Sequence, residues 1–125
     1  MRAPGFREHP NHEVILEQTN HRVKVLFAET TIADTSAAIQ VKESRHANVY
    51  YLPLSDVNQK LLSPSQTTTY CPFKGTARYW DVVTGKHTIR DAIWGYPEPY
   101  DECRDLAEYV SVYTNKLNQI VEHSR

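Results

Sequence analysis

The sequence predicts a mainly β protein, a compact single domain with a curled antiparallel sheet or partly open barrel and one or two short helices. Short runs of β-branched and aromatic residues recur along the chain, and turn residues separate them. The connections between these runs are too short for the crossover helices that a parallel sheet needs. A chain of 125 residues fits one domain, which would bury roughly two-thirds of the surface that its unfolded form exposes.

The first part of the chain is expected to form an extended arm and then a β-hairpin. Residues 1–11 contain two prolines and one glycine, which favour an extended arm, and residues 12–125 form the β-rich domain. Apolar and polar residues alternate in Arg22–Phe27, as in a half-buried strand. His12–Glu17 is another strand-like run, and the turn residues at 18–21 predict that the two runs pair as a hairpin.

Shorter elements are predicted in the middle of the chain. Thr30–Asp34 is rich in β-branched residues and predicts a strand, whereas Ala37–Val41 fits either a strand or a single helical turn. Asn48–Leu52 predicts a strand that ends at a proline. Ser55–Leu62 predicts a short helix capped by its first serine, and the polar run Ser63–Thr69 predicts a surface loop.

Two longer runs predict a second hairpin. Thr76–Val83 and Lys86–Trp94 are strand-like and flank a Thr-Gly pair that is typical of a tight turn. The simplest register for this turn places Trp80 opposite Ile89.

The C-terminal region is predicted to begin with a short helix. Asp101 would cap this helix, and Cys103 and Leu106 would share its buried face. The spacing of apolar residues would let the helix continue through Val121, but the β propensity of Tyr109–Tyr113 favours a strand. We expect a short helix followed by a strand.

The composition bears on partners and compartment. Fourteen basic and fifteen acidic residues give a net charge of −1, which provides no field for attracting a nucleic-acid polymer. No apolar run approaches the roughly 20 residues of a membrane helix, so no membrane partner is expected. Residues 1–13 lack the apolar core of a signal peptide, which predicts a cytoplasmic location and reduced thiols at Cys71 and Cys103. The sequence leaves the oligomeric state open.

The segment Tyr70–Trp80, YCPFKGTARYW, concentrates residues that are able to carry chemistry. Lys74 would place a positive charge at the start of a strand, where it suits a phosphate or carboxylate, or it is a solvated side chain beside a turn. Gly75 would let the backbone turn sharply or approach a ligand closely. The thiol of Cys71 is either activated by the neighbouring ammonium or buried as a small hydrophobic group.

Three carboxylates, Asp34, Glu43 and Asp56, lie beside predicted turns or strand ends and join Lys74 and Cys71 as catalytic candidates. A pair of carboxylates would bind Mg²⁺ or act as a base, because hard cations prefer oxygen ligands. Asp34 and Asp56 also suit structural roles, as a turn residue and a first-turn helix residue. The histidines show no zinc signature, and no metal ligand is assigned.

The aromatic residues predict either a pocket for a planar ligand or simply a core. Because side chains alternate along a strand, Tyr50 and Tyr51 face opposite sides of a sheet. One of the two is expected in the core and the other at the surface or at a site. The candidate ligand-binding residues are Tyr51, Gly75, Arg78, Tyr79, Trp94 and Tyr96.

Six segments, in this order and spacing, resemble a known family: VKVLF, IADTS, VYYLPLSDV, TYCPFKGTARYW, WGYPEP and YVSVY. The family is the domain-of-unknown-function family four hundred twenty-seven, also catalogued as a nucleotidyltransferase family. The similarity extends from about His12 to Tyr113, with the C-P-F-K-G run as its strong marker. It implies a mostly β fold and a soluble cytoplasmic protein. The matching residues are His12, Asp34, Glu43, Tyr51, Pro53, Asp56, Cys71, Pro72, Lys74, Gly75, Ala77, Tyr79, Trp94, Tyr96 and Pro97.

The chain departs from the family pattern in three places. Ala28-Glu29 occupies a turn that usually carries glycines, Gly95 stands where a serine is common, and Val112 stands where a phenylalanine is usual. The missing serine removes a hydroxyl group near Trp94 that would have been available to a site.

Three functions are consistent with these residues. The first is an enzyme acting on a nucleotide or phosphorylated small molecule, with Lys74 on the phosphate, an aromatic ring on the base, and a carboxylate holding Mg²⁺ or acting as base. The second is a non-catalytic module that binds a small molecule or a peptide in the same pocket. The third is a protein–protein interaction domain with an exposed aromatic face. A small-molecule ligand is the favoured partner; the cofactor stays open, with Mg²⁺ as the candidate.

Overall fold

The computed structural model describes residues 1–123, and over this range the fold is mainly β, as the sequence predicts. All pairings between the strands are antiparallel. The helical segments are short: α1 (Gly5–Glu8) and the 3₁₀ helices η1 (Leu54–Asp56), η2 (Gln59–Leu61) and η3 (Asp101–Leu106). The strands are β1 (Val14–Gln18), β2 (Arg22–Phe27), β3 (Thr30–Thr35), β4 (Ile39–Glu43), β5 (Val49–Pro53), β6 (Leu62–Cys71), β7 (Gly75–Thr84), β8 (His87–Gly95), β9 (Tyr109–Val112) and β10 (Asn118–Glu122).

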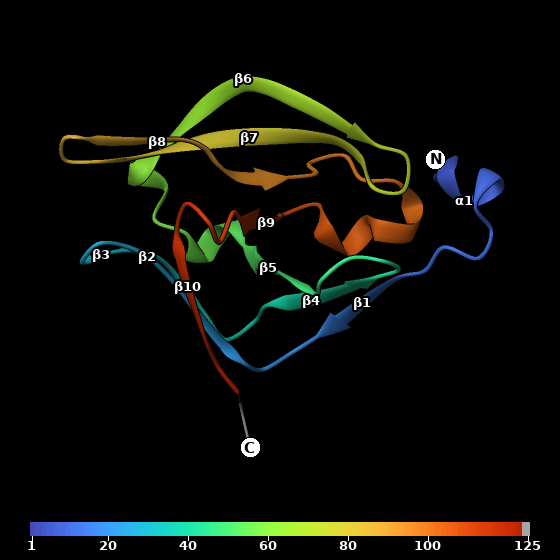
Figure 1. Ribbon diagram of the computed structural model, residues 1–125, viewed down its shortest axis with the longest axis horizontal. Coiled ribbons are helices and arrows are strands. Elements are labelled where there is room, and N and C mark those ends of the chain that lie inside the picture. The colour runs from blue at the N-terminus through green and yellow to red at the C-terminus, as the bar shows by residue number, and fades with distance from the viewer. Residues whose placement is uncertain (124–125) are drawn as a thin grey trace.

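The strands form two sheets of unequal size. Seven strands make the larger sheet, in the order β1-β4-β5-β9-β8-β7-β6, and three make the smaller one, in the order β10-β2-β3. The larger sheet curls near β9, so that β6, β7 and β8 form an upper layer and β1, β4 and β5 a lower layer in Figure 1. Its two end strands, β1 and β6, do not pair with each other, so the sheet does not close into a barrel.

The two faces of the larger sheet contribute to two hydrophobic cores. One core joins the larger sheet to the smaller sheet and includes Val23, Val25, Ile32, Tyr50, Leu52 and Ile93. The other lies inside the curl and includes Ile39, Val41, Tyr51, Ala77, Tyr79, Tyr96, Cys103 and Leu106. Tyr50 and Tyr51 therefore face opposite cores, as strand alternation predicts. The inner core provides the walls of the site described below.

The predicted hairpin between His12–Glu17 and Arg22–Phe27 is wrong, although both segments are strands. β1 pairs with β4, and β2 pairs with β3 and β10 in the other sheet. The backbone N–H and the hydroxyl of Thr19 both donate to the carbonyl of Ala38 instead of closing a turn. The connection after β1 therefore carries the chain from one sheet to the other. The ambiguous run Ala37–Val41 lies largely within the strand β4.

Two predictions between residues 55 and 71 are also wrong. Ser55–Leu62 forms no α-helix but two 3₁₀ turns, and the second is capped by Asn58, whose side chain accepts from the N–H of Lys60. The polar run Ser63–Thr69 belongs to strand β6 and not to a loop. β6 is an edge strand with a bulge, paired on one side only, so its polar side chains can stay in solvent.

The hairpin of β7 and β8 confirms the second predicted hairpin, but its register differs. Val82, and not Trp80, lies opposite Ile89, and beyond a bulge Trp80 lies opposite Ile93. Thr84 lies opposite His87, so the turn residues are Gly85 and Lys86 and not Thr84 and Gly85, and the pairing is already shifted at the turn. The bulge between Trp80 and Val82 shifts it further. The expected short helix followed by a strand is present as η3 and β9, with Tyr100, and not Asp101, at the N-cap position.

The N-terminal arm is not extended throughout, because residues Gly5–Glu8 form the helical turn α1. Ala3 and Gly5 are buried against the domain. The N–H of Gly5 donates to the carbonyl of Pro72 at 3.0 Å, which fastens the arm to the turn between β6 and β7. Among the described residues, no helix has the length and apolar character needed to cross a membrane.

Candidate functional site

The turn between β6 and β7 directs Lys74 towards the inside of the curl. Cys71 and Gly75 pair across the turn, and the N–H of Lys74 donates to the carbonyl of Cys71 at 3.3 Å. Gly75 has a φ of +122°, which a residue with a side chain rarely adopts. A Cβ atom on Gly75 would also lie 3.3 Å from the carbonyl oxygen of Glu98. The glycine therefore allows a turn that buries the side chain of Lys74.

Glu43, the last residue of β4, receives this lysine. Lys74 Nζ lies 2.5 Å from Glu43 Oε1, and His12 Nε2 lies 2.8 Å from Glu43 Oε2. The exposed fractions of the Lys74, Glu43 and His12 side chains are 7%, 10% and 14%. His46 Nδ1 lies farther from the carboxylate, at 4.0 Å. An arm residue, a strand end and a turn thus converge on one carboxylate.

Opposing effects act on the pKa of Glu43. Burial is the largest of them and raises the pKa, because it disfavours the charged carboxylate. The hydrogen bonds from Lys74 and His12 and the nearby ammonium lower the pKa, and together they outweigh burial. The net pKa lies below the ordinary value, so Glu43 is a carboxylate at neutral pH.

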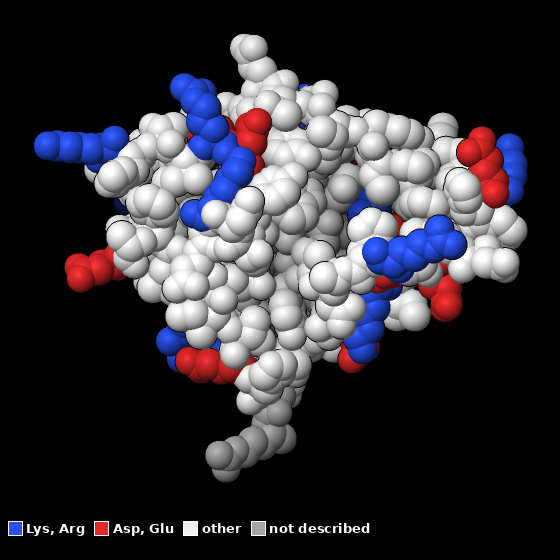
Figure 2. All heavy atoms as spheres, viewed as in Figure 1, with Lys and Arg blue, Asp and Glu red and all other residues white. Residues whose placement is uncertain are grey.

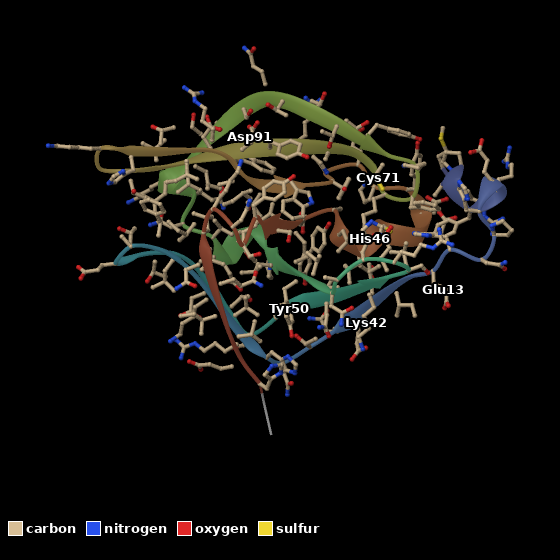
Figure 3. All side chains as sticks on the ribbon, in the orientation of Figure 1. Glu13, Lys42, His46, Tyr50, Cys71 and Asp91 are labelled. Carbon is tan, nitrogen blue, oxygen red and sulfur yellow. The ribbon has the colours of Figure 1, made fainter. Side chains whose placement is uncertain are left out.

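Glu43 and Lys74 line a pocket of about 240 Å³ between the two layers of the larger sheet. Figure 2 shows this face hollowed between the layers, and Figure 3 shows Cys71 on the upper side and His46 on the lower side. The lining residues are Val41, Glu43, His46, Ala47, Val49, Tyr51, Cys71, Lys74, Trp94 and Tyr96. We call this cavity the Glu43 pocket. Its walls are mainly apolar and aromatic, and its charged groups are gathered at the Glu43–Lys74 pair.

Two tyrosine hydroxyl groups add hydrogen-bond donors to this pocket. The indole Nε1–H of Trp94 donates to the Tyr51 hydroxyl at 3.3 Å. Because an indole only donates, the proton of the Tyr51 hydroxyl stays available, and no residue of the described chain accepts it. The Tyr96 hydroxyl makes no hydrogen bond to any residue between positions 1 and 123. Burial raises the pKa of both tyrosines, so both hydroxyls stay protonated.

A larger hollow of about 610 Å³ is lined in part by His12. It is lined by arm residues from Glu8 to His12, by Ser44–His46 and by Phe73. The imidazole of His12 stacks on Phe73 with ring centroids 4.0 Å apart and an interplanar angle of 18°. His46 lines both this hollow and the Glu43 pocket. The arm therefore helps to hold His12 in place beside Glu43.

The structure brings six of the eleven candidate residues to the Glu43 pocket and places the other five elsewhere. Asp34 pairs with Arg22 on the surface, and Asp56 accepts a hydrogen bond from Thr35. Both aspartates line a shallow hollow of about 420 Å³ at β3 and η1. The six residues at the Glu43 pocket are Glu43, Tyr51, Cys71, Lys74, Trp94 and Tyr96.

The remaining three candidates are Gly75, Arg78 and Tyr79. Gly75 and Arg78 line a different hollow of about 460 Å³, together with Glu98 and Tyr100. The Tyr79 hydroxyl pairs with that of Thr69 at 2.9 Å. Their expected contact with a ligand in the Glu43 pocket therefore has no direct geometric support.

The candidate carboxylates do not form a magnesium site. Among residues 1–123, no group of three or more His, Cys, Asp or Glu side chains is arranged to hold a metal ion. Glu43 is engaged by Lys74 and His12, whereas Asp34 and Asp56 lie at another hollow. The three carboxylates that the sequence suggested as Mg²⁺ ligands therefore do not lie at one site, and no chemistry is assigned to such an ion.

The two thiols occupy different environments. Both cysteines are free, and Cys71 is half-buried at the wall of the Glu43 pocket. Cys103 is completely buried, and its Sγ donates to the carbonyl of Phe73 at 3.7 Å. Burial raises the pKa of the Cys103 thiol to about 11. Cys103 is therefore a core residue, and Cys71 is the thiol that a ligand in the pocket would meet.

Comparison with protein-family models shows the family to which the chain belongs. Residues 15–123 match the model of a family described as Domain of unknown function (DUF427). The chain belongs to the DUF427 family. No curated protein matches the chain.

Some residues that line this DUF427 pocket or contact Glu43 were not singled out as site candidates in the sequence. His12 matches the family pattern, but its hydrogen bond to Glu43 spans 31 residues of the chain, which local spacing cannot reveal. His46 and Ala47, in the connection between β4 and β5, and Val49, the first residue of β5, also line the pocket. The C-P-F-K-G run was the one clear sequence signal for this place.

Proposed function

We propose that this DUF427 domain binds a small, uncharged, planar heterocycle in the Glu43 pocket. The observation that carries the proposal is the pairing of Glu43 with Lys74 at the polar end of an aromatic-walled cavity. A buried ion pair contributes little to stability by itself, because removing both charges from water costs as much as their attraction returns. Its presence at a pocket wall is better explained by a ligand.

The polar groups complement a ring that carries neighbouring N–H and C=O groups. The Glu43 carboxylate accepts hydrogen bonds, whereas Lys74 and the hydroxyls of Tyr51 and Tyr96 donate them. Only Glu43 accepts from Lys74 Nζ in the structure, and an ammonium has three protons, so two stay available. Trp94 offers an aromatic surface for a planar ring. A volume of about 240 Å³ also suits a ligand below the usual drug size.

The charge balance favours an uncharged ligand over a phosphate. The positive charge of Lys74 is matched by Glu43 at 2.5 Å. A phosphate in the pocket would have to approach that carboxylate, and like charges at short range repel each other. The expected phosphate contact of Lys74 therefore receives no support from the geometry.

Binding is better supported than catalysis. The lowered pKa of Glu43 makes it a weak base at neutral pH, whereas an efficient general base has a pKa close to the working pH. The transfer of nucleotidyl groups, to which the family's name refers, usually employs paired carboxylates and a phosphate cradle. An interaction role through an exposed aromatic face has less support, because Tyr50, Tyr51, Tyr79 and Tyr96 are buried.

The proposal is tested by calorimetric titration with uracil and hypoxanthine, two rings that carry the N–H and C=O pattern. We expect saturable binding, weakened about threefold to tenfold in Tyr96→Phe by the loss of one hydrogen bond. The melting temperature of this variant should be unchanged, because the Tyr96 hydroxyl has no partner among residues 1–123. Tyr70→Phe is the control, since its hydroxyl pairs with that of Tyr100 away from the Glu43 pocket. If neither uracil nor hypoxanthine binds, the proposal is refuted.

A further inference from the structure

A second hollow adjoins the Glu43 pocket at Trp94. This hollow has a volume of about 230 Å³ and shares Ala47, Val49 and Trp94 with the Glu43 pocket. The two hollows therefore adjoin at Trp94, and a ligand in the Glu43 pocket would lie next to the second hollow.

The lining of the second hollow is polar but uncharged. No Asp, Glu, Lys or Arg residue lines it. The amides of Asn48, Asn115 and Gln119 make no hydrogen bond to any residue of the described chain, so their donors and acceptors stay available. The lining residues are Ala47, Asn48, Val49, Tyr50, Trp94, Ser111, Val112, Tyr113, Thr114, Asn115 and Gln119. Each amide both donates and accepts, as a hydroxyl group does.

An aromatic pair lies where the two hollows adjoin. The rings of Trp94 and Tyr113 lie 4.5 Å apart between centroids, with an interplanar angle of 38°. Burial raises the pKa of the Tyr113 hydroxyl to about 12, so this group stays protonated, and it pairs with the Tyr79 hydroxyl at 3.4 Å. The Lys116 ammonium lies 5.2 Å from the centroid of the Tyr113 ring and donates to the carbonyl of Arg90 at 2.8 Å, and Lys116 is not among the residues that line the hollow.

We infer that the ligand carries a hydroxyl-bearing, phosphate-free substituent, as a nucleoside does, and that this substituent occupies the second hollow. The inference rests on the proposed function, because the ring of the same ligand fills the Glu43 pocket. Neutral amides match hydroxyl groups, and the second hollow has no cation to match a phosphate. Each hollow alone is small, whereas a nucleoside places a ring and a sugar in adjoining spaces.

Calorimetric titrations with uracil, uridine and uridine monophosphate test this inference. We expect uridine to bind at least about tenfold more tightly than uracil, as two added hydrogen bonds would give. Uridine monophosphate should bind more weakly than uridine. Asn115→Ala should weaken uridine binding about threefold to tenfold and leave uracil binding unchanged. Asn118→Ala is the matched control, because Asn118 is exposed and does not line the hollow.

The outcomes separate this inference from the proposed function. If uracil binds and uridine binds no more tightly, the second hollow has no such role, and the proposed function stands. If uridine is favoured but Asn115→Ala has no effect, the sugar lies elsewhere and the inference is wrong. If uridine monophosphate binds most tightly, the phosphate-free ligand is wrong. If none of the three binds, and hypoxanthine and inosine also fail, both the proposed function and the inference are overturned.

Discussion

Lys74 Nζ lies 2.5 Å from Glu43 Oε1, although the two residues are 31 positions apart in the chain. Lys74 comes from the turn between β6 and β7, and Glu43 from the end of β4. These elements belong to opposite layers of the curled sheet, so the pair links the two layers.

Removal of Lys74 alone should destabilise the protein. In Lys74→Met the Glu43 carboxylate would stay buried without its main partner, and we expect a loss of about 3 kcal/mol in the free energy of unfolding. The double variant Glu43→Gln/Lys74→Met should recover at least half of that loss, because no charge is then left unpaired. Urea denaturation measures each value.

The matched control for Lys74→Met is Lys42→Met. Lys42 neighbours Glu43 on β4 and pairs with Glu17 at 2.9 Å, and 43% of its side chain is exposed, against 7% for Lys74. An exposed pair contributes about 0–1 kcal/mol, so this variant should change stability little. If Lys74→Met lowered the free energy of unfolding no more than Lys42→Met, the Glu43–Lys74 pair would behave as an exposed pair, contrary to this prediction.

The contribution of Glu43 to stability should be lost in acid. Folding lowers the pKa of Glu43 below its ordinary value of 4.5, so the carboxylate favours the folded state above that pH. The stability that it provides is lost as the pH falls through the folded-state pKa. The difference in unfolding free energy between wild type and Glu43→Gln should therefore be constant near neutral pH and shrink below about pH 4.5.

Urea denaturation of both proteins over a pH series measures this difference. Asp34 and Asp91 also have lowered pKa values, but they titrate in both proteins and cancel. A difference that grew on acidification would mean that folding raises the pKa of Glu43, contrary to the geometry.

The N-terminal arm should depend on the absence of a side chain at Gly5. A Cβ atom there would lie 2.7 Å from the ring of Phe73 and 2.9 Å from the carbonyl oxygen of Pro72. We expect Gly5→Ala to cost about 1–3 kcal/mol and to release the arm. Hydrogen exchange should then speed up at the amide of residue 5 and at that of His9, which bonds the carbonyl of Gly5.

Arg7→Ala is the control for the arm, because Arg7 is exposed on the same helical turn and should leave exchange unchanged. Unaltered protection of residue 5 and His9 in Gly5→Ala would show that the arm does not depend on this close contact.

The two cysteines should react at different rates in the native protein. Cys71 is half-buried at the Glu43 pocket, whereas Cys103 is fully buried and the pKa of its thiol is raised to about 11. Because the thiolate is the reacting species, iodoacetamide should modify Cys71 first and Cys103 only on unfolding. Peptide mass spectrometry assigns the adducts. Equal labelling of both thiols in the native state would contradict the placement of Cys103 in the core.

Local sequence patterns predicted most strands but few of their partners. Arg22–Phe27 and Thr30–Asp34 are strands because alternating or β-branched residues suit a pleated surface. The pairing of β1 with β4 was missed, because partner choice depends on the packing of distant segments. Strand β6 was missed because an edge strand tolerates the polar residues of a loop.

The site was predictable at the C-P-F-K-G turn and less so around it. Gly75 signalled a special backbone, which its φ of +122° confirms. Ala28, which replaces a usual family glycine, has a positive φ of 53°, so that departure marks a real turn. The contact of His12 with Glu43 and the separation of Asp34 from Glu43 depend on the tertiary fold, which spacing along the chain does not encode.

The indole signals of the two tryptophans provide the most direct test of ligand binding in the Glu43 pocket. Trp94 Nε1–H donates to Tyr51 at the pocket wall, whereas Trp80 does not line the pocket. A ¹H–¹⁵N correlation spectrum, assigned with Trp80→Phe, should be recorded during titration with uracil and then with uridine. We predict that the Trp94 signal moves saturably and that the Trp80 signal stays in place. A Trp94 signal that does not move with either compound, or that moves no more than that of Trp80, would contradict the account.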